Sequence, residues 1–357
     1  MKKLFESLKV GDLELENRII MAPLTRCRCD AGAIPSEIMI AYYQQRATAG
    51  MIIAEATAVS PMGIGYPDTP GIWSDSQIRS WKKITDAVHE KGGKIVLQLW
   101  HVGRMSDPCY LEGELPVAPS AIAPGGHISL LRPKKTFVTP RALALADIPG
   151  IVKSFAKGAA NAMEAGFDGV EIHGANGYLL NQFFNAGSNQ REDSYGGSVE
   201  NRSKLMLEVL DSVIDVCGAG RVGLHISPQD DEHSMLQSDF STSLGDYTYL
   251  IKEVNKRNIA FLFVRESANS ANCVGPHLRT IFNGIYIANE EFTPEAAEAA
   301  VENGKADAVS FGRLFIANPD LPARLYRNEK LNELNPDRYY HATIEKGYTD
   351  YPELDRI

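Results

Sequence analysis

Short apolar segments recur along the chain, and stretches with helical periodicity separate most of them. Eight such segments end where polar residues or glycines begin, at 18–22, 51–56, 94–100, 169–173, 222–227, 260–264, 284–288 and 308–311. Helical patterns occupy 75–91, 149–165, 199–216, 245–255 and 293–303. Alternating buried strands and helices are typical of parallel α/β folds, and eight strands predict a (β/α)8 TIM barrel. We expect one domain over residues 1–357.

Two segments stand outside this alternation. Residues 8–15 alternate around a Gly-Asp pair, which predicts a small N-terminal hairpin before the first barrel strand. Residues 107–147, after the third strand, are rich in proline and glycine and lack strong periodicity. This stretch predicts an inserted loop over the upper face of the barrel, where specificity elements lie.

Composition narrows the classes of partner. The hydrophobic fraction of 44% and charged fraction of 23% are those of an ordinary soluble protein. A net charge of -9 argues against nucleic acid or an anionic membrane as partner. The sequence has neither a signal-peptide pattern after Met1 nor a membrane-spanning apolar run, so we expect a cytoplasmic protein. The 5 cysteines lack metal-ligand spacing, so we expect free thiols and no bound metal.

The fourth predicted strand ends in three polar side chains. His173, Asn176 and Tyr178 follow it within six positions, at the end where parallel α/β proteins bind ligands. His173 and Asn176 can both donate to one ligand oxygen, and Tyr178 can deliver a proton nearby. Taken singly, these are readily explained as a core histidine, a turn asparagine and a packing tyrosine. Together at one strand end, they predict a catalytic group.

The other strand ends add neutral hydrogen-bonding groups and few carboxylates, among them Thr25, Gln98 and His225. Such a set suits a flat heteroaromatic ligand better than a hydrolytic site, which needs paired acids or a metal. After the eighth strand, Gly312-Arg313 stands where such barrels hold a phosphate. For Arg313 alone, a surface salt bridge is an equally good explanation.

Several motifs resemble one family in the same order. They are NRIIMAPLTR at 17–26, EAT at 55–57, QLWHVGR at 98–104, the stretch 169–183, NQR at 189–191, YGGSVENR at 195–202, FGR at 311–313 and IANPDL at 316–321. In them the chain closely resembles the Old Yellow Enzyme family of FMN-dependent ene-reductases, over nearly its whole length. Several motifs at fitting spacing are far more specific than any one of them.

The resemblance implies that FMN lies over the barrel mouth. Thr25 would then donate to flavin O4, and Gln98 would contact the pyrimidine edge. Four further residues would hold the cofactor, two along the isoalloxazine and two at the phosphate: Pro23 and Ala56, Gly312 and Arg313. His225 would lie beside flavin N1 and O2.

The resemblance also implies a reaction. His173 and Asn176 would bind the carbonyl oxygen of an α,β-unsaturated substrate, and Tyr178 would protonate the α-carbon while flavin N5 gives hydride to the β-carbon. Tyr66, Trp100 and Tyr340 would line the substrate pocket. NADPH or NADH would reduce the flavin from the same face, so the reductant would need no Rossmann dinucleotide-binding unit. We expect a monomer or weak homo-oligomer that acts on small electrophilic alkenes, with nitro compounds or quinones as further acceptors.

The chain departs from the family pattern in four places. His225 replaces the usual arginine, which predicts weaker FMN retention or a lower flavin potential. After the seventh strand, Glu290-Glu291 replaces a glycine-containing turn. That change would either deny the turn a positive φ and repel the phosphate, or leave both carboxylates in solvent. The loop at 265–269 is unusual, and its Arg265 is a candidate for the cation missing at His225. Residues 229–239 also lack the sequence that is usual in the family.

Three alternatives to an active ene-reductase follow from these features. A degenerate barrel with weak FMN binding would act as a small-molecule binding protein or a slow reductase, as the two departures at His225 and Glu290 favour. A glycosidase would need opposed acids ending strands 4 and 7, but Glu171 lies one layer deeper and Glu290 alone is not a pair. Iron–sulfur dienoyl reductases need a cysteine cluster and further nucleotide-binding domains, and the chain has neither pattern.

Overall fold

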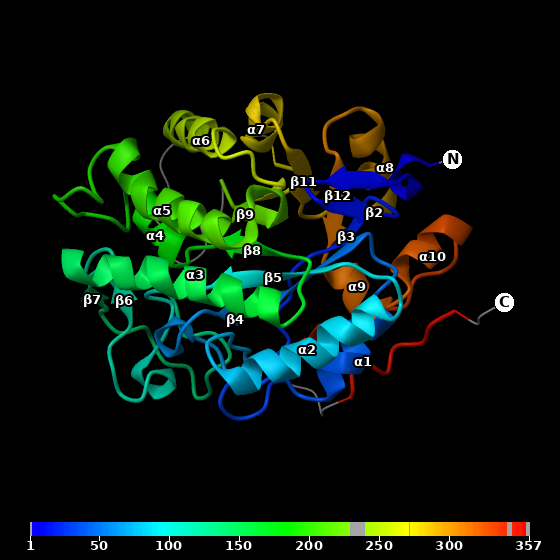
Figure 1. Ribbon diagram of the computed structural model, residues 1–357, viewed down its shortest axis with the longest axis horizontal. Helices are drawn as coiled ribbons and strands as arrows, with labels where there is room; N and C mark the ends of the chain where they lie inside the picture. Colours follow the sequence, from blue (N-terminus) through cyan, green and yellow to red (C-terminus); the bar gives the residue numbers. More distant parts are fainter. Residues whose placement is uncertain (1, 229–239, 271, 341–344, 355–357) are drawn as a thin grey trace.

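The computed structural model describes residues 2–228, 240–270, 272–340 and 345–354, and its centre is a closed barrel of parallel strands (Figure 1). The barrel strands, in chain order, are β3 (Ile19–Met21), β4 (Met51–Ala58), β5 (Ile95–Trp100), β8 (Gly169–His173), β9 (Val222–Ile226), β10 (Phe261–Arg265), β11 (Ile285–Asn289) and β12 (Ala308–Phe311). Neighbours around the barrel follow chain order, and β12 pairs with β3 to close it. The predicted TIM barrel and each of its strands are confirmed.

The strands are recognisable in the sequence because helices cover them outside and side chains fill the barrel inside. All residues of β4, β5, β8 and β9 are buried, so these strands appear as continuous apolar runs. Inside the barrel, Ile53, Val96 and Phe263 belong to one apolar cluster. The predicted hairpin, β1 (Leu8–Val10) with β2 (Leu13–Leu15), packs on that cluster. The apolar hairpin packs at the end where the chain enters the barrel.

Helices surround the barrel and confirm the predicted helical stretches. They are α1 (Ile38–Gln45), α2 (Asp75–His89), α3 (Ile148–Glu164), α4 (Leu179–Phe184), α5 (Val199–Cys217), α6 (Phe240–Asn255), α7 (Gly275–Ile281), α8 (Pro294–Glu302), α9 (Arg313–Ala317) and α10 (Leu321–Arg327). Ser74 begins α2 with a capping box: its hydroxyl accepts from the Gln77 backbone, and the Gln77 side chain accepts in return. Trp81, fully buried, attaches the same helix to the core.

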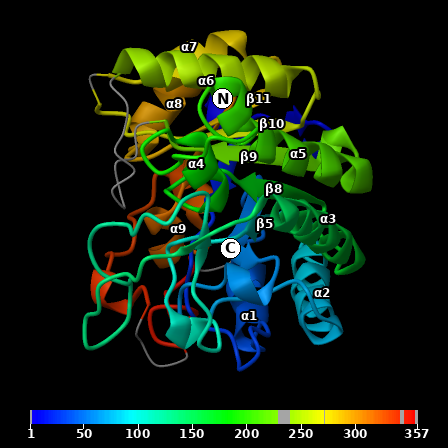
Figure 2. The ribbon, with the colours of Figure 1, turned by 90° about the vertical axis from the view of Figure 1, so that its left-hand side faces the viewer.

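The predicted insertion between β5 and α3 is confirmed as an irregular loop. Its regular structure is limited to the two-residue strands β6 (Val117–Ala118) and β7 (Arg141–Ala142) and to 3-10 turns at Pro108–Tyr110 and Leu145–Asp147. Figure 2 shows this loop, in teal, on the opposite side of the view from α2 and α3. Its residues His127, Ile128, Arg132 and Lys134 reach the cavity described below.

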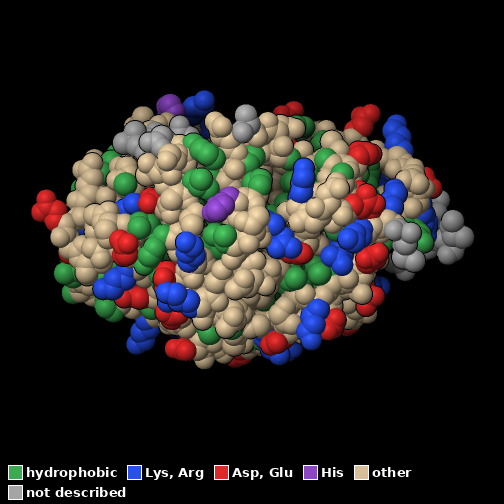
Figure 3. All heavy atoms as spheres, turned by 90° about the horizontal axis from the view of Figure 1, so that it is seen from above, with side chains coloured by type: hydrophobic (Ala, Val, Ile, Leu, Met, Phe, Trp, Pro, Cys, Tyr) green, Lys and Arg blue, Asp and Glu red, His purple; other side chains and the backbone are tan. Residues whose placement is uncertain are grey.

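The distribution of surface charge and the apolarity of the helices indicate which kinds of partner the protein can bind. On the face seen in Figure 3, lysines and arginines are interspersed with aspartates and glutamates, and no single-sign patch covers that face. None of the helices in the described ranges is both long and apolar enough to span a bilayer.

Candidate functional site

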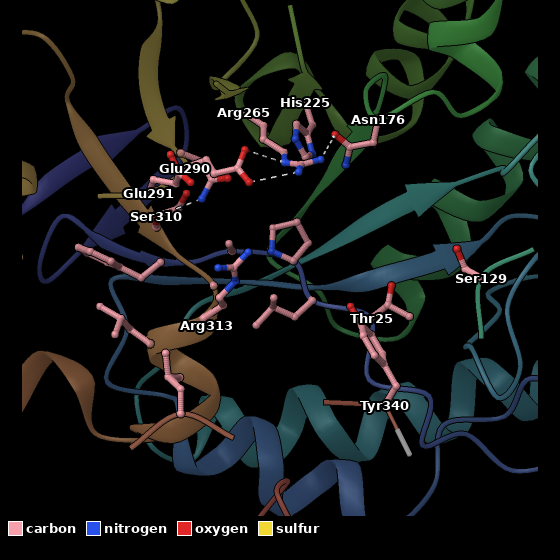
Figure 4. Close-up of a pocket in the computed structure, with 18 of the residues that line it drawn as sticks. Thr25, Ser129, Asn176, His225, Arg265, Glu290, Glu291, Ser310, Arg313 and Tyr340 are labelled. Atoms are coloured by element: carbon pink, nitrogen blue, oxygen red, sulfur yellow. Dashed lines mark hydrogen bonds and ion pairs between the residues drawn. The ribbon is translucent and has the colours of Figure 1, made fainter. Parts of the chain in front are cut away.

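A cavity of about 970 Å³ opens where the barrel strands end, at the upper limit of ordinary ligand pockets. Most of the predicted site residues line it: Pro23, Thr25, Tyr66, Asn176, Tyr178, His225, Gly312, Arg313 and Tyr340. Figure 4 shows the side chains of Asn176 and His225 on one wall, with Arg313 and Thr25 across the space from them. Residues far apart in the sequence therefore meet at one mouth, as the barrel topology predicts.

The remaining predicted residues, Ala56, Gln98, Trp100 and His173, form the layer behind this lining. Trp100 packs edge-on against Tyr178, with ring centres 5.1 Å apart, and Ala56 belongs to the same apolar cluster. The rings of His173 and His225 stack at 4.9 Å. Gln98 donates to His225. Every predicted site residue thus lies at this end of the barrel, although the role of each remains a prediction.

The turn after β8 fixes the three polar residues that follow the strand. Asn176 adopts the left-handed conformation (φ +56°), which asparagine tolerates well, and its backbone N–H donates to Ser227 Oγ at 2.8 Å. Tyr178 is the N-cap residue of α4, and its hydroxyl lies 2.9 Å from that of Tyr66. The phenol is therefore held at the cavity wall by a second phenol.

His173 is a neutral hydrogen-bond donor. Its Nδ1 accepts the backbone N–H of Ala175 at 3.3 Å, so Nε2 carries the proton. Burial, and then the positive charge of Arg265, lower the pKa of His173 to about 3. The imidazole therefore keeps one N–H and no net charge at neutral pH.

A polar network lies beneath the cavity floor. Gln98 Nε2 donates to Glu171 Oε2 at 2.6 Å and to His225 Nδ1 at 3.0 Å. Because Nδ1 of His225 accepts, its proton lies on Nε2, which is buried and has no hydrogen-bond partner within the described residues. Burial holds the pKa of His225 well below its usual value, so this group is a neutral donor. The 3.7 Å contact between His225 and Glu171 is not an ion pair.

Glu171 makes a pH dependence of stability expected. Burial raises the pKa of Glu171 from 4.5 to about 8, so the folded state binds its proton more tightly than the unfolded chain does. The free energy of unfolding should therefore fall as pH rises from about 4.5 to about 8. In Glu171→Gln, this loss should be absent, and the gain in Tm over wild type should grow across that window and then level off. Thermal unfolding measured in steps of pH tests it, with the exposed Glu14→Gln as control. Parallel profiles for Glu171→Gln and wild type would contradict it.

The turn after β11 contradicts the first expectation and meets the second only at Glu291, which is exposed. Glu291 takes φ +58° without being glycine, so the left-handed turn is kept. Glu290 is not left in solvent either, because its two carboxylate oxygens each accept from Arg265 at 3.2 Å. Glu291 accepts from Ser267 and Asn269. The carboxylates are held by the neighbouring loop after β10, which the sequence pattern did not reveal.

Arg265 is the cavity residue that the sequence identified least securely. It ends β10, lines the cavity with Glu290, and donates through Nη1 to Asn176 Oδ1 at 3.0 Å. It therefore points into the cavity and not away from it. Its sequence signal was only an arginine at a strand end. The stretch 229–239, also unusual in sequence, lies outside the described residues.

The donors in this cavity fit FMN. Arg313 makes no hydrogen bond or ion pair with any other described residue, and it lines the cavity next to Gly312, which suits a terminal phosphate. The unpartnered Nε2 of His225 suits an acceptor on a ring edge, and the hydroxyl of Thr25 lies on the same cavity. Among the described residues, no group of three His, Cys, Asp or Glu side chains could hold a metal ion.

A closed (β/α)8 barrel whose mouth carries neutral donors and an arginine that suits a phosphate has the features of a flavin oxidoreductase. A family model for NADH:flavin oxidoreductases and NADH oxidases matches residues 3–332, and the chain belongs to that family.

Individual relatives agree with this assignment. A probable flavin mononucleotide-dependent alkene reductase of Leishmania infantum is 42% identical over 98% of this chain and 97% of its own length. The solved old yellow enzyme homologue of Zymomonas mobilis matches with a TM-score of 0.95 at 42% identity, covering 98% of this chain and 99% of that chain. Morphinone reductase in complex with tetrahydroNAD matches with a TM-score of 0.93 at 43% identity, covering 99% of this chain and 98% of that chain. The resemblance to the Old Yellow Enzyme family is confirmed.

His225 leads to a prediction about the flavin. A neutral histidine stands where the family usually has arginine, so a reduced flavin bound beside it would lack a cation at this position. We expect His225→Arg to raise the flavin midpoint potential and to tighten FMN binding, because a fixed charge favours the reduced anion. Both quantities are measured by redox titration and by FMN titration of the apoprotein, with the exposed His277→Arg as control. An unchanged potential together with an unchanged affinity would exclude this role for position 225.

Proposed function

We propose that the protein is an FMN-dependent NAD(P)H oxidoreductase that reduces the activated C=C bond of α,β-unsaturated carbonyl compounds. The observation that carries this proposal is that Asn176 and Tyr178 line a cavity whose other wall suits FMN, with the His173 ring packed edge-on against Tyr178 directly behind them. Membership of the flavin oxidoreductase family supports it, as does the likeness to an alkene reductase.

His173 and Asn176 bind and polarise the substrate. Their N–H groups donate to the carbonyl oxygen, which draws electron density from the alkene and stabilises the enolate that forms. Because His173 is neutral, it donates a hydrogen bond without transferring a proton. When bound, FMN supplies the hydride that the β-carbon accepts.

Tyr178 completes the reduction by protonating the α-carbon. Its hydroxyl contacts that of Tyr66, so the two phenols form a route by which the donated proton can be replaced. Trp100 packs edge-on against the Tyr178 ring and restricts its movement. The substrate would thus gain one hydride, supplied by FMN, and one proton, supplied by Tyr178.

NADPH or NADH would supply the electrons for the next reduction. Morphinone reductase, which this chain resembles, is known in complex with tetrahydroNAD, and we propose that the reductant enters the same cavity here. The rates of flavin reduction by NADPH and by NADH, measured side by side, decide which of the two is preferred. We also propose that the chain forms one domain, that the protein is a cytoplasmic monomer or weak homo-oligomer, and that nitro compounds or quinones serve as further acceptors.

The structure gives no support to the competing functions. For a glycosidase, Glu171 is buried against Gln98 and Glu290 is paired with Arg265, so neither carboxylate is placed as an opposed acid. For a degenerate barrel, the cavity would have to reject FMN, yet it is open and lined by donors.

The absorption spectrum of the purified protein tests the proposal. We expect a yellow protein, or one that FMN makes yellow, that NADPH or NADH bleaches and 2-cyclohexenone reoxidises. A colourless protein that FMN fails to reconstitute would contradict the proposal and favour the degenerate barrel.

A further inference from the structure

The Arg265 side chain lies at the cavity wall and connects two turns, the one after β11 and the one between β8 and α4. It extends from the end of β10, with Glu290 of the β11 turn on one side and Asn176 of the β8–α4 turn on the other (Figure 4). Nε and Nη2 donate to the two carboxylate oxygens of Glu290, each at 3.2 Å, and Nη1 donates to Asn176 Oδ1 at 3.0 Å.

This contact fixes which end of the Asn176 carboxamide faces the cavity. A guanidinium has donors only, so the group that it contacts must be the amide oxygen and not the amide nitrogen. The nitrogen is then on the other side of the carboxamide, and Figure 4 shows it turned toward the cavity interior. The backbone of Asn176 is anchored independently through Ser227, so Arg265 acts on the side chain alone.

Glu290 holds Arg265 in the orientation that reaches Asn176. A two-point contact with a carboxylate fixes the plane of a guanidinium, and here both side chains are largely shielded, with 23% and 31% of their surface exposed. The carboxylate also balances a positive charge that lies close to the neutral His173. Arg265 and Glu290, the unusual residues of these two loops, are therefore parts of one arrangement with Asn176.

We propose that Arg265 is a positioning residue, held by Glu290, that turns the Asn176 carboxamide so that its N–H group meets the substrate oxygen. The charged hydrogen bond to Oδ1 also draws electron density from the amide and makes its N–H a stronger donor. This inference rests on the proposed function, in which Asn176 binds the substrate carbonyl.

A double-mutant cycle on the FMN-loaded protein tests the inference. Arg265→Met removes the donor and keeps much of the side-chain volume, whereas Arg265→Lys keeps a cation that can still donate. We expect Arg265→Met to slow reoxidation of the reduced protein by 2-cyclohexenone by about tenfold, and Glu290→Gln to have a smaller effect in the same direction. Arg265→Lys should recover part of the rate.

In the Asn176→Ala background, Arg265→Met should change the rate by less than about twofold, because the group that it orients is gone. The midpoint potential and Tm of each variant are measured in parallel. An undiminished effect of Arg265→Met without Asn176, accompanied by a shifted potential, would overturn the inference and make Arg265 a charge that acts on the flavin.

Two further outcomes distinguish a failure of the Arg265 inference from a failure of the proposed function. If the wild type is reoxidised and Arg265→Met is equally fast, the inference is wrong and the proposed function stands. If 2-cyclohexenone fails to reoxidise the wild type, the proposed function is wrong and the inference falls with it.

Discussion

Tyr178→Phe is expected to slow reoxidation of the reduced flavin by 2-cyclohexenone by about 10²–10⁴-fold, the range typical of a lost general acid. The substitution removes one hydroxyl and keeps the ring that packs against Trp100 and His173. Reduction of the flavin by NADPH or NADH needs no proton from this group and should stay within about twofold of wild type. Rapid-mixing absorbance measurements under anaerobic conditions follow the two half-reactions separately.

Tyr66 makes this prediction sharper. Its hydroxyl lies 2.9 Å from that of Tyr178, so Tyr66→Phe alone should have a much smaller effect than Tyr178→Phe. Tyr195→Phe is a matched control, since that buried hydroxyl contacts Glu208 on the outside of the barrel. Equal reoxidation rates in Tyr178→Phe and wild type would show that the proton comes from elsewhere.

His173→Leu should lower the same rate by about 10²–10³-fold, as expected when one of two donors to a developing oxyanion is removed. Leucine fills part of the space beside His225 but has no N–H. His173→Asn restores a donor and should recover part of the lost rate. A His173→Leu protein that reduces the enone at the wild-type rate would remove His173 from the reaction.

The pH dependence offers an independent view of His173. Because burial and Arg265 hold its pKa at about 3, the imidazole stays neutral at all higher pH. We therefore expect no inflection in the reoxidation rate near the ordinary histidine value of about 6.5. The rate measured between pH 5 and 9 checks this expectation, and a loss of activity on raising pH through 6.5 would indicate a protonated donor instead.

The barrel could be predicted from sequence because its signals are local. Parallel strands buried on both faces leave apolar runs such as 51–56, and helices between them carry their own periodicity and caps. The hairpin was predictable for the same reason, since Gly11 adopts a left-handed turn, φ +57°, between two alternating segments. Strand-end residues could then be assigned to one mouth by topology alone.

The parts of the site that sequence could not supply depend on distant partners. Asn176, Arg265 and Glu290 are separated by 89 and 25 positions, and no local pattern announces that they meet. The positive φ of Glu291 was unexpected because glycine usually marks it. The charge state of His225 likewise depends on its burial and on the nearby His173 and Arg265. The hydrophobic pattern of a strand does not give these influences.

The departures at His225 and Glu290 favoured a degenerate barrel from sequence, but the contacts of these side chains do not support that interpretation. Glu290 is paired with Arg265 and is not a lone charge in the cavity that Arg313 lines. His225 keeps a proton on Nε2 and can donate to a ring edge although it lacks a charge. We infer that the charges at the site differ from the family pattern, whereas its hydrogen-bond donors are kept.

The most direct test is a single anaerobic turnover. The FMN-loaded protein is reduced with one equivalent of NADPH or NADH and mixed with 2-cyclohexenone, and the flavin absorbance and the organic product are measured together. We predict that the yellow colour returns as one cyclohexanone forms per flavin. A flavin that stays bleached in the presence of the enone, or regains its colour without forming cyclohexanone, would contradict ene-reduction at this cavity.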